Sequence, residues 1–197
     1  MADEVRISTL SGPVTGFISR GSDGAPRVEI TQPAGKVTDL TAEQEADVLA
    51  TLRLSRADLL DAPIQNAVTS RVKTLIPIRD SERLQALITD ITRTEACWSL
   101  ASTGLYPYAV LDRDAQLFEA RQFPRSSGYP EDAVTGIAAA ALAFGLLRIG
   151  LIKSNDACVR VLQGRTMGCL SEISVRIGLA GNRAIGALLG GEVSFRI

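Results

Sequence analysis

The stretch PEDAVTGIAAAALAFGLLRIG, residues 130–150, is the most strongly helical part of the sequence and decides the fold. Its polar start is followed by an almost unbroken apolar run from Ile137 to Leu147. A helix that is apolar on every side must be buried on every side. The run is shorter than the about 20 residues that a transmembrane helix needs. We therefore expect a central helix over 131–149 inside a chain that does not enter the membrane.

Segments that follow this helix supply strands that can enclose it. Two of them alternate apolar and polar residues, as strands with one buried face do. The apolar positions are Val159, Val161, Ile173, Val175 and Ile177. The expected strands span 158–163, 172–179 and 191–197, and the Gly-rich stretches GLAGN and LLGG are expected to be turns. A sheet curled around a wholly apolar helix covers it on all sides, so we expect an α+β fold.

The first half of the chain predicts a short meander followed by mixed elements. Strands are expected over 5–9, 14–18, 27–31, 71–78, 105–111 and 117–123. Helical segments are expected from Thr41, at 55–61, at 81–91 with Leu84, Leu87, Ile88 and Ile91 on one face, and over 92–100. Residues 65–70 are interpreted as a polar linker. This organisation predicts two units, residues 1–70 and residues 71–197, the second containing the central helix.

Composition excludes several classes of chemistry. The chain has 21 Lys+Arg, 22 Asp+Glu and no His. Without His there is no Ser-His-Asp triad, no Cys-His pair and no His-containing zinc site. The charge balance disfavours nucleic-acid binding. The 3 cysteines are odd in number and none has CxxC spacing, which favours a reducing cytoplasm. The acidic N-terminus does not resemble a signal peptide.

The start of the central helix is the candidate site for chemistry. A helix N-terminus presents unpaired N–H groups and a partial positive charge, which can hold the carboxylate of a substrate. Asp132, Thr135 and Gly136 lie at this point, and Gly136 would let a ligand approach the backbone. Capping of the helix by Asp132 or Thr135 is the alternative interpretation. We expect the neighbouring Glu131 to face solvent.

Two stretches carry a family resemblance: FPRSSGYPEDAVTGIAAAALAFGLLRIGLI and, further on, QGRTMGCLSEISVRI. They resemble the two signatures of the phenazine-biosynthesis (PhzF-like) isomerase family, F-x-P-x-x-G-x-x-E-D-P-x-T-G-S-A and Q-G-x-x-M-G-R-P-S-x-I-x-V. That family belongs to the diaminopimelate-epimerase-like superfamily. The resemblance implies lobes built as a curled sheet around a central helix, with the active site in a cleft between two of them. It also implies proton transfer on a small acidic metabolite without a cofactor or a metal.

Residue by residue, the resemblance assigns Asp132 the catalytic role. The substrate-binding residues expected at the motif positions are Thr135, Gly136, Ile137, Met167, Gly168 and Ser171. Arg125 and Arg165 flank the two motifs and are expected either to pair with a substrate carboxylate or to be solvated at the surface. The sequence departs from the family at Ile137, where the family has Ser, and at Ala133, where it has Pro. The catalytic Glu and the G-H-x-T-type turn of the family's first lobe have no counterpart. We therefore expect one complete lobe and a remnant of the other.

An incomplete lobe would leave strand edges and an apolar face open, so we expect a homodimer or a partner chain that completes the first lobe. Three functions remain open. The first is an isomerase-like enzyme with Asp132 as acid and base. The second is a reshaped pocket that promotes a cyclisation or another reaction without acid–base catalysis. The third is a non-catalytic subunit or ligand binder.

Overall fold

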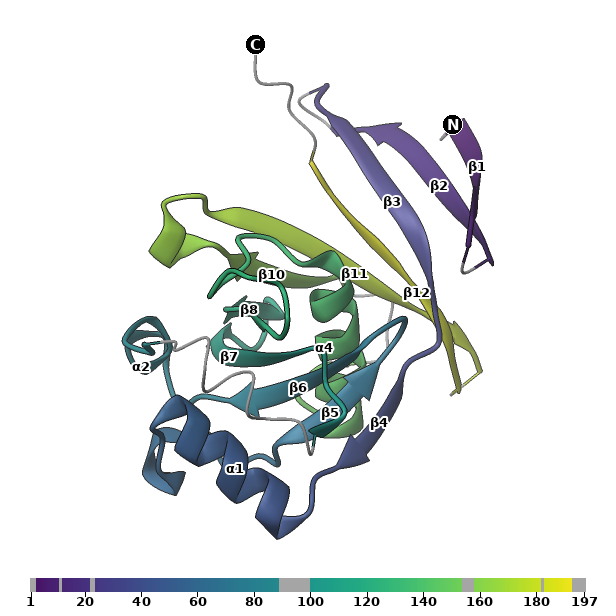
Figure 1. Ribbon diagram of the computed structural model, residues 1–197. Coiled ribbons are helices and arrows are strands. Elements are labelled where there is room, and N and C mark those ends of the chain that lie inside the picture. Colours follow the sequence, from purple (N-terminus) through teal and green to yellow (C-terminus); the bar gives the residue numbers. More distant parts are fainter. Residues whose placement is uncertain are drawn as a thin grey trace.

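The computed structural model describes residues 3–10, 12–21, 24–88, 100–153, 158–181 and 183–192. The strands lie in one 12-stranded sheet in the order β1-β2-β3-β12-β11-β10-β8-β7-β6-β5-β4, with β9 paired to β7. The sheet is curled around the helix α4 and is not closed, since β1 and β4 are its two ends (Figure 1). The strands are β1 (Asp3–Thr9), β2 (Gly12–Arg20), β3 (Pro26–Pro33), β4 (Lys36–Asp39), β5 (Gln65–Val68), β6 (Val72–Pro77), β7 (Gly104–Asp112), β8 (Leu117–Ala120), β9 (Phe123–Pro124), β10 (Val159–Gln163), β11 (Ser171–Ala180) and β12 (Arg183–Glu192). The helices are α1 (Ala42–Leu52), α2 (Ser81–Gln85) and α4 (Gly136–Arg148), with short 3-10 helices at η1 (Arg56–Asp58) and η3 (Arg165–Met167).

The central helix is α4, and its residues from Ala138 to Leu146 are all buried. The prediction of a helix buried on every side is therefore confirmed. The predicted start was wrong, because the helix begins at Gly136 and not near residue 131. The N–H of Asp132 donates to the carbonyl of Gln122 at 2.9 Å, so the preceding segment is bound to the β8–β9 connection instead of forming a first helical turn.

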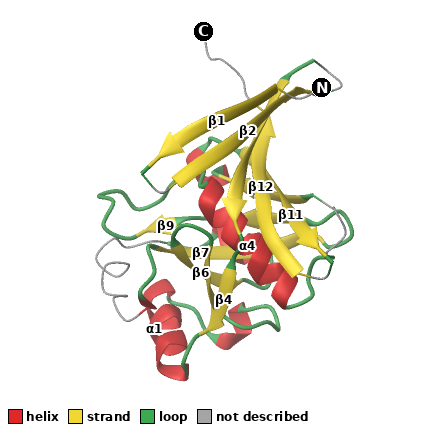
Figure 2. Ribbon diagram, turned by 90° about the vertical axis from the view of Figure 1, so that its right-hand side faces the viewer, coloured by secondary structure: helices red, strands yellow, loops and turns green. Residues whose placement is uncertain are grey.

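The strands beside α4 follow the alternation in the sequence. Ile173, Val175 and Ile177 of β11 are buried against the helix, and so are Ala187 and Leu189 of β12. The long β11–β12 hairpin lies along α4 (Figure 2). The predicted turn LLGG was wrong, because β12 begins at Arg183 and continues through LLGG to Glu192. The strand predicted at 191–197 is described only at residues 191 and 192, which end β12, and its other positions lie outside the described residues. Here glycines allow close strand contact: a Cβ on Gly190 would lie 2.4 Å from the carbonyl of Val28.

The interpretation of 65–70 as a linker was also wrong. Residues Gln65–Val68 form β5, which pairs with β4 and β6. Its polar residue Asn66 is satisfied inside the protein, since its amide donates to the carbonyl of Leu100 and its oxygen accepts from the Thr74 hydroxyl. Because β4 and β5 contact α4, residues on both sides of the expected division at residue 70 enclose the central helix.

The opposite side of this part of the sheet carries a second core under α1 and α2. Val48 and Leu52 of α1, Leu84 of α2 and Ile76 of β6 are buried in it. Thr41 and Ser55 precede α1 and η1, where helical segments were expected, and each forms a capping box. Helix α2 is shorter than predicted. Of the residues expected on one face of this helix, Leu87 is buried but Ile88 is 78% exposed. Ile91 lies outside the described residues, and so does the expected continuation over 92–100 except for Leu100.

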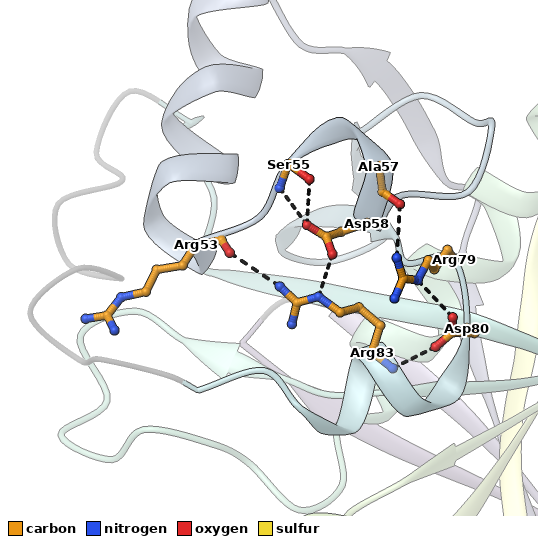
Figure 3. A network of polar contacts seen from close by, with 7 residues as sticks. All are labelled: Arg53, Ser55, Ala57, Asp58, Arg79, Asp80 and Arg83. Carbon is orange, nitrogen blue, oxygen red and sulfur yellow. Dashed lines mark hydrogen bonds and ion pairs between the residues drawn. The ribbon is translucent and has the colours of Figure 1, made fainter.

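Two carboxylates connect the elements on this side (Figure 3). Asp58 accepts from the backbone and hydroxyl of Ser55 and from the Arg83 guanidinium, and these bonds hold the pKa of Asp58 well below its usual range. Asp80 caps α2 by accepting from the backbone N–H of Arg83 and also pairs with Arg79. The network joins the end of α1, η1 and the start of α2.

The strands β1, β2 and β3 extend away from the part of the sheet that surrounds α4 (Figures 1 and 2). Within the described ranges, no helix is both long and apolar enough to cross a lipid bilayer. The same ranges contain no cluster of three or more His, Cys, Asp or Glu side chains suited to a metal ion.

Candidate active site at the head of the central helix

The segment before α4 holds Asp132 beside the helix N-terminus. The Thr135 hydroxyl donates to Asp132 Oδ2 at 2.6 Å, while the Asp132 backbone is anchored to Gln122. Both side chains are half-buried. Thr135 is the N-cap residue, but its side chain makes no capping hydrogen bond, so its hydroxyl orients the Asp132 carboxylate instead. One carboxylate oxygen of Asp132 is thereby held by the hydroxyl of the N-cap residue of α4.

The second motif meets the first through Gln163, the last residue of β10. Its amide nitrogen donates to the carbonyl of Asp132 at 2.7 Å and to the Thr135 hydroxyl at 3.3 Å. Its amide oxygen accepts from the Tyr106 hydroxyl at 3.0 Å. Burial, together with the charge of Asp132, holds the pKa of Tyr106 well above its usual range, so this hydroxyl stays a donor. Gln163 was not among the expected site residues, although it is the first residue of the second family signature.

Gly164 brings the two motifs into contact. Its φ is +88°, and a Cβ there would lie 2.5 Å from the carbonyl of Cys169 and 2.7 Å from the carbonyl of Ala133. Both obstacles are backbone atoms, which cannot rotate away. The glycine is therefore required for the contact between the PEDAVT segment and the turn that follows β10.

We expect Gly164→Ala to lower the free energy of unfolding by roughly 2–4 kcal/mol, because left-handed backbone and steric overlap both act against Ala. Urea unfolding measures it. Gly181→Ala is the matched control, since Gly181 has φ +60° but nothing within 4 Å of a Cβ, and it should cost only about 1–2 kcal/mol. Equal losses in the two variants would show that the contact between the motifs is not tight.

Glu131 does not face solvent as expected. Its carboxylate forms a two-point ion pair with Arg121, at 2.9 Å to Nε and 2.7 Å to Nη2, and the two side chains are 9% and 6% exposed. The Thr166 hydroxyl adds a bond to Glu131 at 3.0 Å. The expectation failed because adjacent carboxylates in a sequence give no sign that a cation ten residues earlier, just after β8, will pair with one of them.

The other expected site residues lie around this head with different roles. Ile137 is half-buried, and the space left by Gly136 is filled by Leu189, whose methyl would lie 2.8 Å from a Cβ. Met167 is exposed at the end of η3, and Gly168 follows with φ +68°. The Ser171 hydroxyl donates to the carbonyl of Cys169 at 3.2 Å.

Two arginines flank the motifs. Arg125 follows β9, and its backbone N–H donates to the carbonyl of Thr103. Arg165, considered as a partner for a substrate carboxylate, is paired with the buried Glu119, which also accepts from the Ser81 hydroxyl. Arg165 therefore serves an internal ion pair.

The described cysteines and two of the tyrosines differ in burial. Cys169 is exposed and Cys158 is half-buried, both as free thiols, and burial raises the pKa of Cys158. Tyr106 and Tyr108 fill the core. Cys97 and Trp98 lie outside the described residues.

A buried lysine also belongs to this region and was missed by the sequence analysis. Lys73 of β6 is only 4% exposed, and burial lowers its pKa to about 8, although the charge of Asp132 acts in the opposite direction. The near-continuous apolar run of β6 around it was the available signal, since such runs indicate strands covered on both faces.

Comparison with known proteins relates the chain to one family and to proteins named as isomerases. The profile of the family described as "Phenazine biosynthesis-like protein" matches residues 1–192. An "Uncharacterized isomerase" of Deinococcus radiodurans is 29% identical over 195 residues, which are 96% of this chain and 62% of that protein. "Uncharacterized isomerase YddE" of Escherichia coli O157:H7 is 26% identical over 181 residues, 89% of this chain and 60% of that protein. The chain thus spans about three fifths of the length of these curated relatives.

Solved structures share the fold. A phenazine biosynthesis protein of the PhzF family from Bacillus anthracis superposes with a TM-score of 0.82 at 16% identity, covering 97% of this chain and 67% of that one. A predicted epimerase from Pseudomonas aeruginosa gives 0.77 at 24% identity, covering 97% and 64%. A hydroxyproline epimerase from Agrobacterium vitis, with bound trans-4-hydroxy-L-proline, gives 0.57 at 13% identity, covering 97% and 56%. The expected epimerase-like α+β fold is confirmed.

Proposed function

Because the chain belongs to the phenazine biosynthesis-like family, we propose that it is an isomerase-like enzyme that moves a proton on a small acidic metabolite without a cofactor. The observation that carries the proposal is the half-buried Asp132 carboxylate, oriented by Thr135 at the head of α4. A carboxylate so placed can accept a proton from a carbon acid and return it.

The surroundings of Asp132 support binding of an acidic substrate. The first N–H groups of α4 and the helix dipole favour an anion. Ile137 and Met167 are proposed to offer apolar contact, while Gly168 lies on the turn after η3 and Ser171 begins β11. Arg125 contributes a cation between β9 and the motif. These residues are proposed to bind substrate while Asp132 reacts with it.

The test is hydrogen exchange at carbon. The chain is incubated in D₂O with a panel of small amino, imino and hydroxy acids, including L-proline and trans-4-hydroxy-L-proline, because a structural neighbour binds the latter. Proton NMR should show enzyme-dependent loss of a C–H signal for at least one acid. A rate that depends steeply on pH in the carboxylate range would support Asp132. Turnover with a flat pH dependence would favour the reshaped pocket without acid–base catalysis instead.

We also propose that a second polypeptide covers β1–β3. On these strands Val5, Ile7 and Ile18 are 42%, 49% and 40% exposed. Their strand pairing puts them on the same side of the sheet as Leu189, which packs in the α4 core. A second copy of the chain is the simplest cover, and a partner chain completing the first lobe is the alternative.

We further propose a reducing compartment such as the cytoplasm, which the free Cys158 and Cys169 support.

Light scattering at micromolar concentration should give twice the mass of the chain. Ile7→Lys should shift the population to the monomer, because it places a charge in the proposed apolar contact. Arg6→Lys on the opposite side of β1 is the control and should leave the mass unchanged. A monomeric wild-type chain would contradict self-association and direct attention to the partner chain.

A further inference from the structure

Lys73 lies on the side of β6 that faces the central helix. Thr74 pairs with Leu105 and Leu75 with Tyr106, so Lys73 shares a face with Leu75 and lies beside Gly104. Its side chain is 4% exposed. The other lysines of the chain, Lys36 and Lys153, are exposed. A lysine enclosed in this way needs an explanation, because burial of an ammonium group costs free energy.

A second unexplained polar group lies next to it. Gln122 is fully buried, and within the described part of the chain neither its amide nitrogen nor its amide oxygen has a hydrogen-bond partner. The amide lies against Gly104, where a Cβ would be 2.2 Å from its nitrogen. The backbone carbonyl of Gln122 accepts a hydrogen bond from the N–H of Asp132. An unsatisfied buried amide therefore lies near Lys73, and the backbone of the same glutamine binds the segment that carries Asp132.

The charged and titratable groups that act on Lys73 are few. Burial is the main cause of its lowered pKa of about 8, the neighbouring Arg71 adds to it, and Asp132 opposes it. Tyr106 on the adjacent strand feels the same Asp132 charge and stays protonated. Unlike an arginine, a lysine in this state can release and take up a proton near neutral pH.

We propose that Lys73 is the second proton-transfer residue of the site, donating a proton to the substrate while Asp132 removes one, with the Gln122 amide orienting the substrate's polar group. The inference rests on the proposed function. Asp132 takes the proton from the substrate C–H, and the electron pair of that bond moves into the adjacent unsaturated or carboxyl group. The Lys73 ammonium then protonates the new position. Asp132 is left as the acid and Lys73 as the amine, and proton transfer from Asp132 to Lys73 through solvent restores both.

The first test follows Lys73 without any substrate. With ¹³Cε-labelled lysine, the signal lost in Lys73→Met identifies Lys73, and the signals of Lys36 and Lys153 serve as internal references. Lys73 should titrate near pH 8, about 2 pH units below the ordinary value of a lysine. In Asp132→Asn its titration should move to lower pH, because the opposing negative charge is gone. Titration of Lys73 together with the references, or no response to Asp132→Asn, would overturn the proposal.

The second test uses the exchange assay in D₂O with the acid that the wild-type chain turns over. Lys73→Met and Lys73→Arg should each reduce exchange at least 10²-fold, since neither can donate a proton near neutral pH. Lys36→Met is the control and should keep the wild-type rate. Added ethylamine should restore part of the activity of Lys73→Ala.

Near-normal exchange in Lys73→Arg would overturn the proposal, because it would reduce Lys73 to a fixed positive charge. If the wild-type chain exchanges no acid, the proposed function fails and the catalytic role of Lys73 fails with it. The substrate-free titration separates failure of the proposed function from failure of the Lys73 proposal. If Lys73 titrates near pH 8 and responds to Asp132→Asn while no acid is exchanged, only the proposed reaction is refuted, together with the role of Lys73 in it. Failure of the titration alone would instead remove Lys73 and leave Asp132 as the candidate base.

Discussion

Asp132→Asn is expected to reduce carbon-hydrogen exchange by about 10²–10⁴-fold, the usual contribution of a general acid–base group. The amide has the shape of the carboxylate and can still accept the Thr135 hydroxyl bond, but it cannot accept a proton from a carbon acid. The bonds that Asp132 makes through its backbone, to Gln122 and Gln163, do not depend on the side chain. The free energy of unfolding should therefore change by less than about 1 kcal/mol.

Two measurements and two further variants make this result specific. Proton NMR in D₂O gives the exchange rate, and urea unfolding gives the stability of the same variant. Asp114→Asn is the control, because Asp114 is exposed between β7 and β8 and far in sequence from both motifs. Thr135→Val should cause a smaller loss than Asp132→Asn, because it removes the hydroxyl that orients the carboxylate and accepts from Gln163 but leaves the carboxylate itself. Undiminished exchange in Asp132→Asn would refute the assignment of Asp132 as the base.

The sequence predicted the parts of the fold that are governed by local pattern. The apolar run predicted that α4 is buried on all sides, and alternation predicted the buried face of β11. The start of α4 was missed by several residues because a distant carbonyl, that of Gln122, binds Asp132. Strand β5 was missed because its polar Asn66 is satisfied by Leu100 and Thr74, which are remote in sequence.

In the candidate site, too, the residues found from the sequence differ from those that depend on tertiary packing. The family resemblance identified Asp132 and Thr135, and the structure joins their side chains by a hydrogen bond. Lys73, Gln122 and Gln163 did not emerge from the sequence, because burial of a polar side chain depends on what the fold packs above and below it. On β6 both faces are covered, by α4 on one side and by the core under α1 on the other, so Lys73 is only 4% exposed although its charge alone would suggest a place at the surface.

Arg121→Met is expected to lower the free energy of unfolding by about 3–5 kcal/mol, the usual cost of breaking a buried ion pair from one side. The Arg121 guanidinium holds Glu131 at two points and lies 4.9 Å from the Phe123 ring. Its remaining nitrogen, Nη1, donates to three carbonyls at the end of α2, those of Leu84, Gln85 and Leu87. The variant would leave a buried carboxylate without its cation and remove the donor for these carbonyls.

The chain contains a matched control for this prediction. Arg160 and Glu172 form the same two-point ion pair, at 2.8 and 2.7 Å, but their side chains are 44% and 43% exposed. Arg160→Met should cost no more than about 1 kcal/mol, because exposed ion pairs contribute little. Urea unfolding of both variants compares the two pairs directly. Equal losses would mean that burial does not determine the cost of breaking the Arg121–Glu131 pair.

A double variant separates the ion pair from the carbonyl contacts. Arg121→Met combined with Glu131→Met removes both charges, so the penalty of an unpaired buried carboxylate disappears and part of the stability should return. The carbonyls of Leu84, Gln85 and Leu87 would still lack their donor, so recovery should be incomplete. Because Glu131 precedes Asp132 directly, exchange activity should fall in the single variant through displacement of the loop. If the double variant is no more stable than Arg121→Met, then Arg121 acts mainly as the donor to the end of α2 and not as the partner of Glu131.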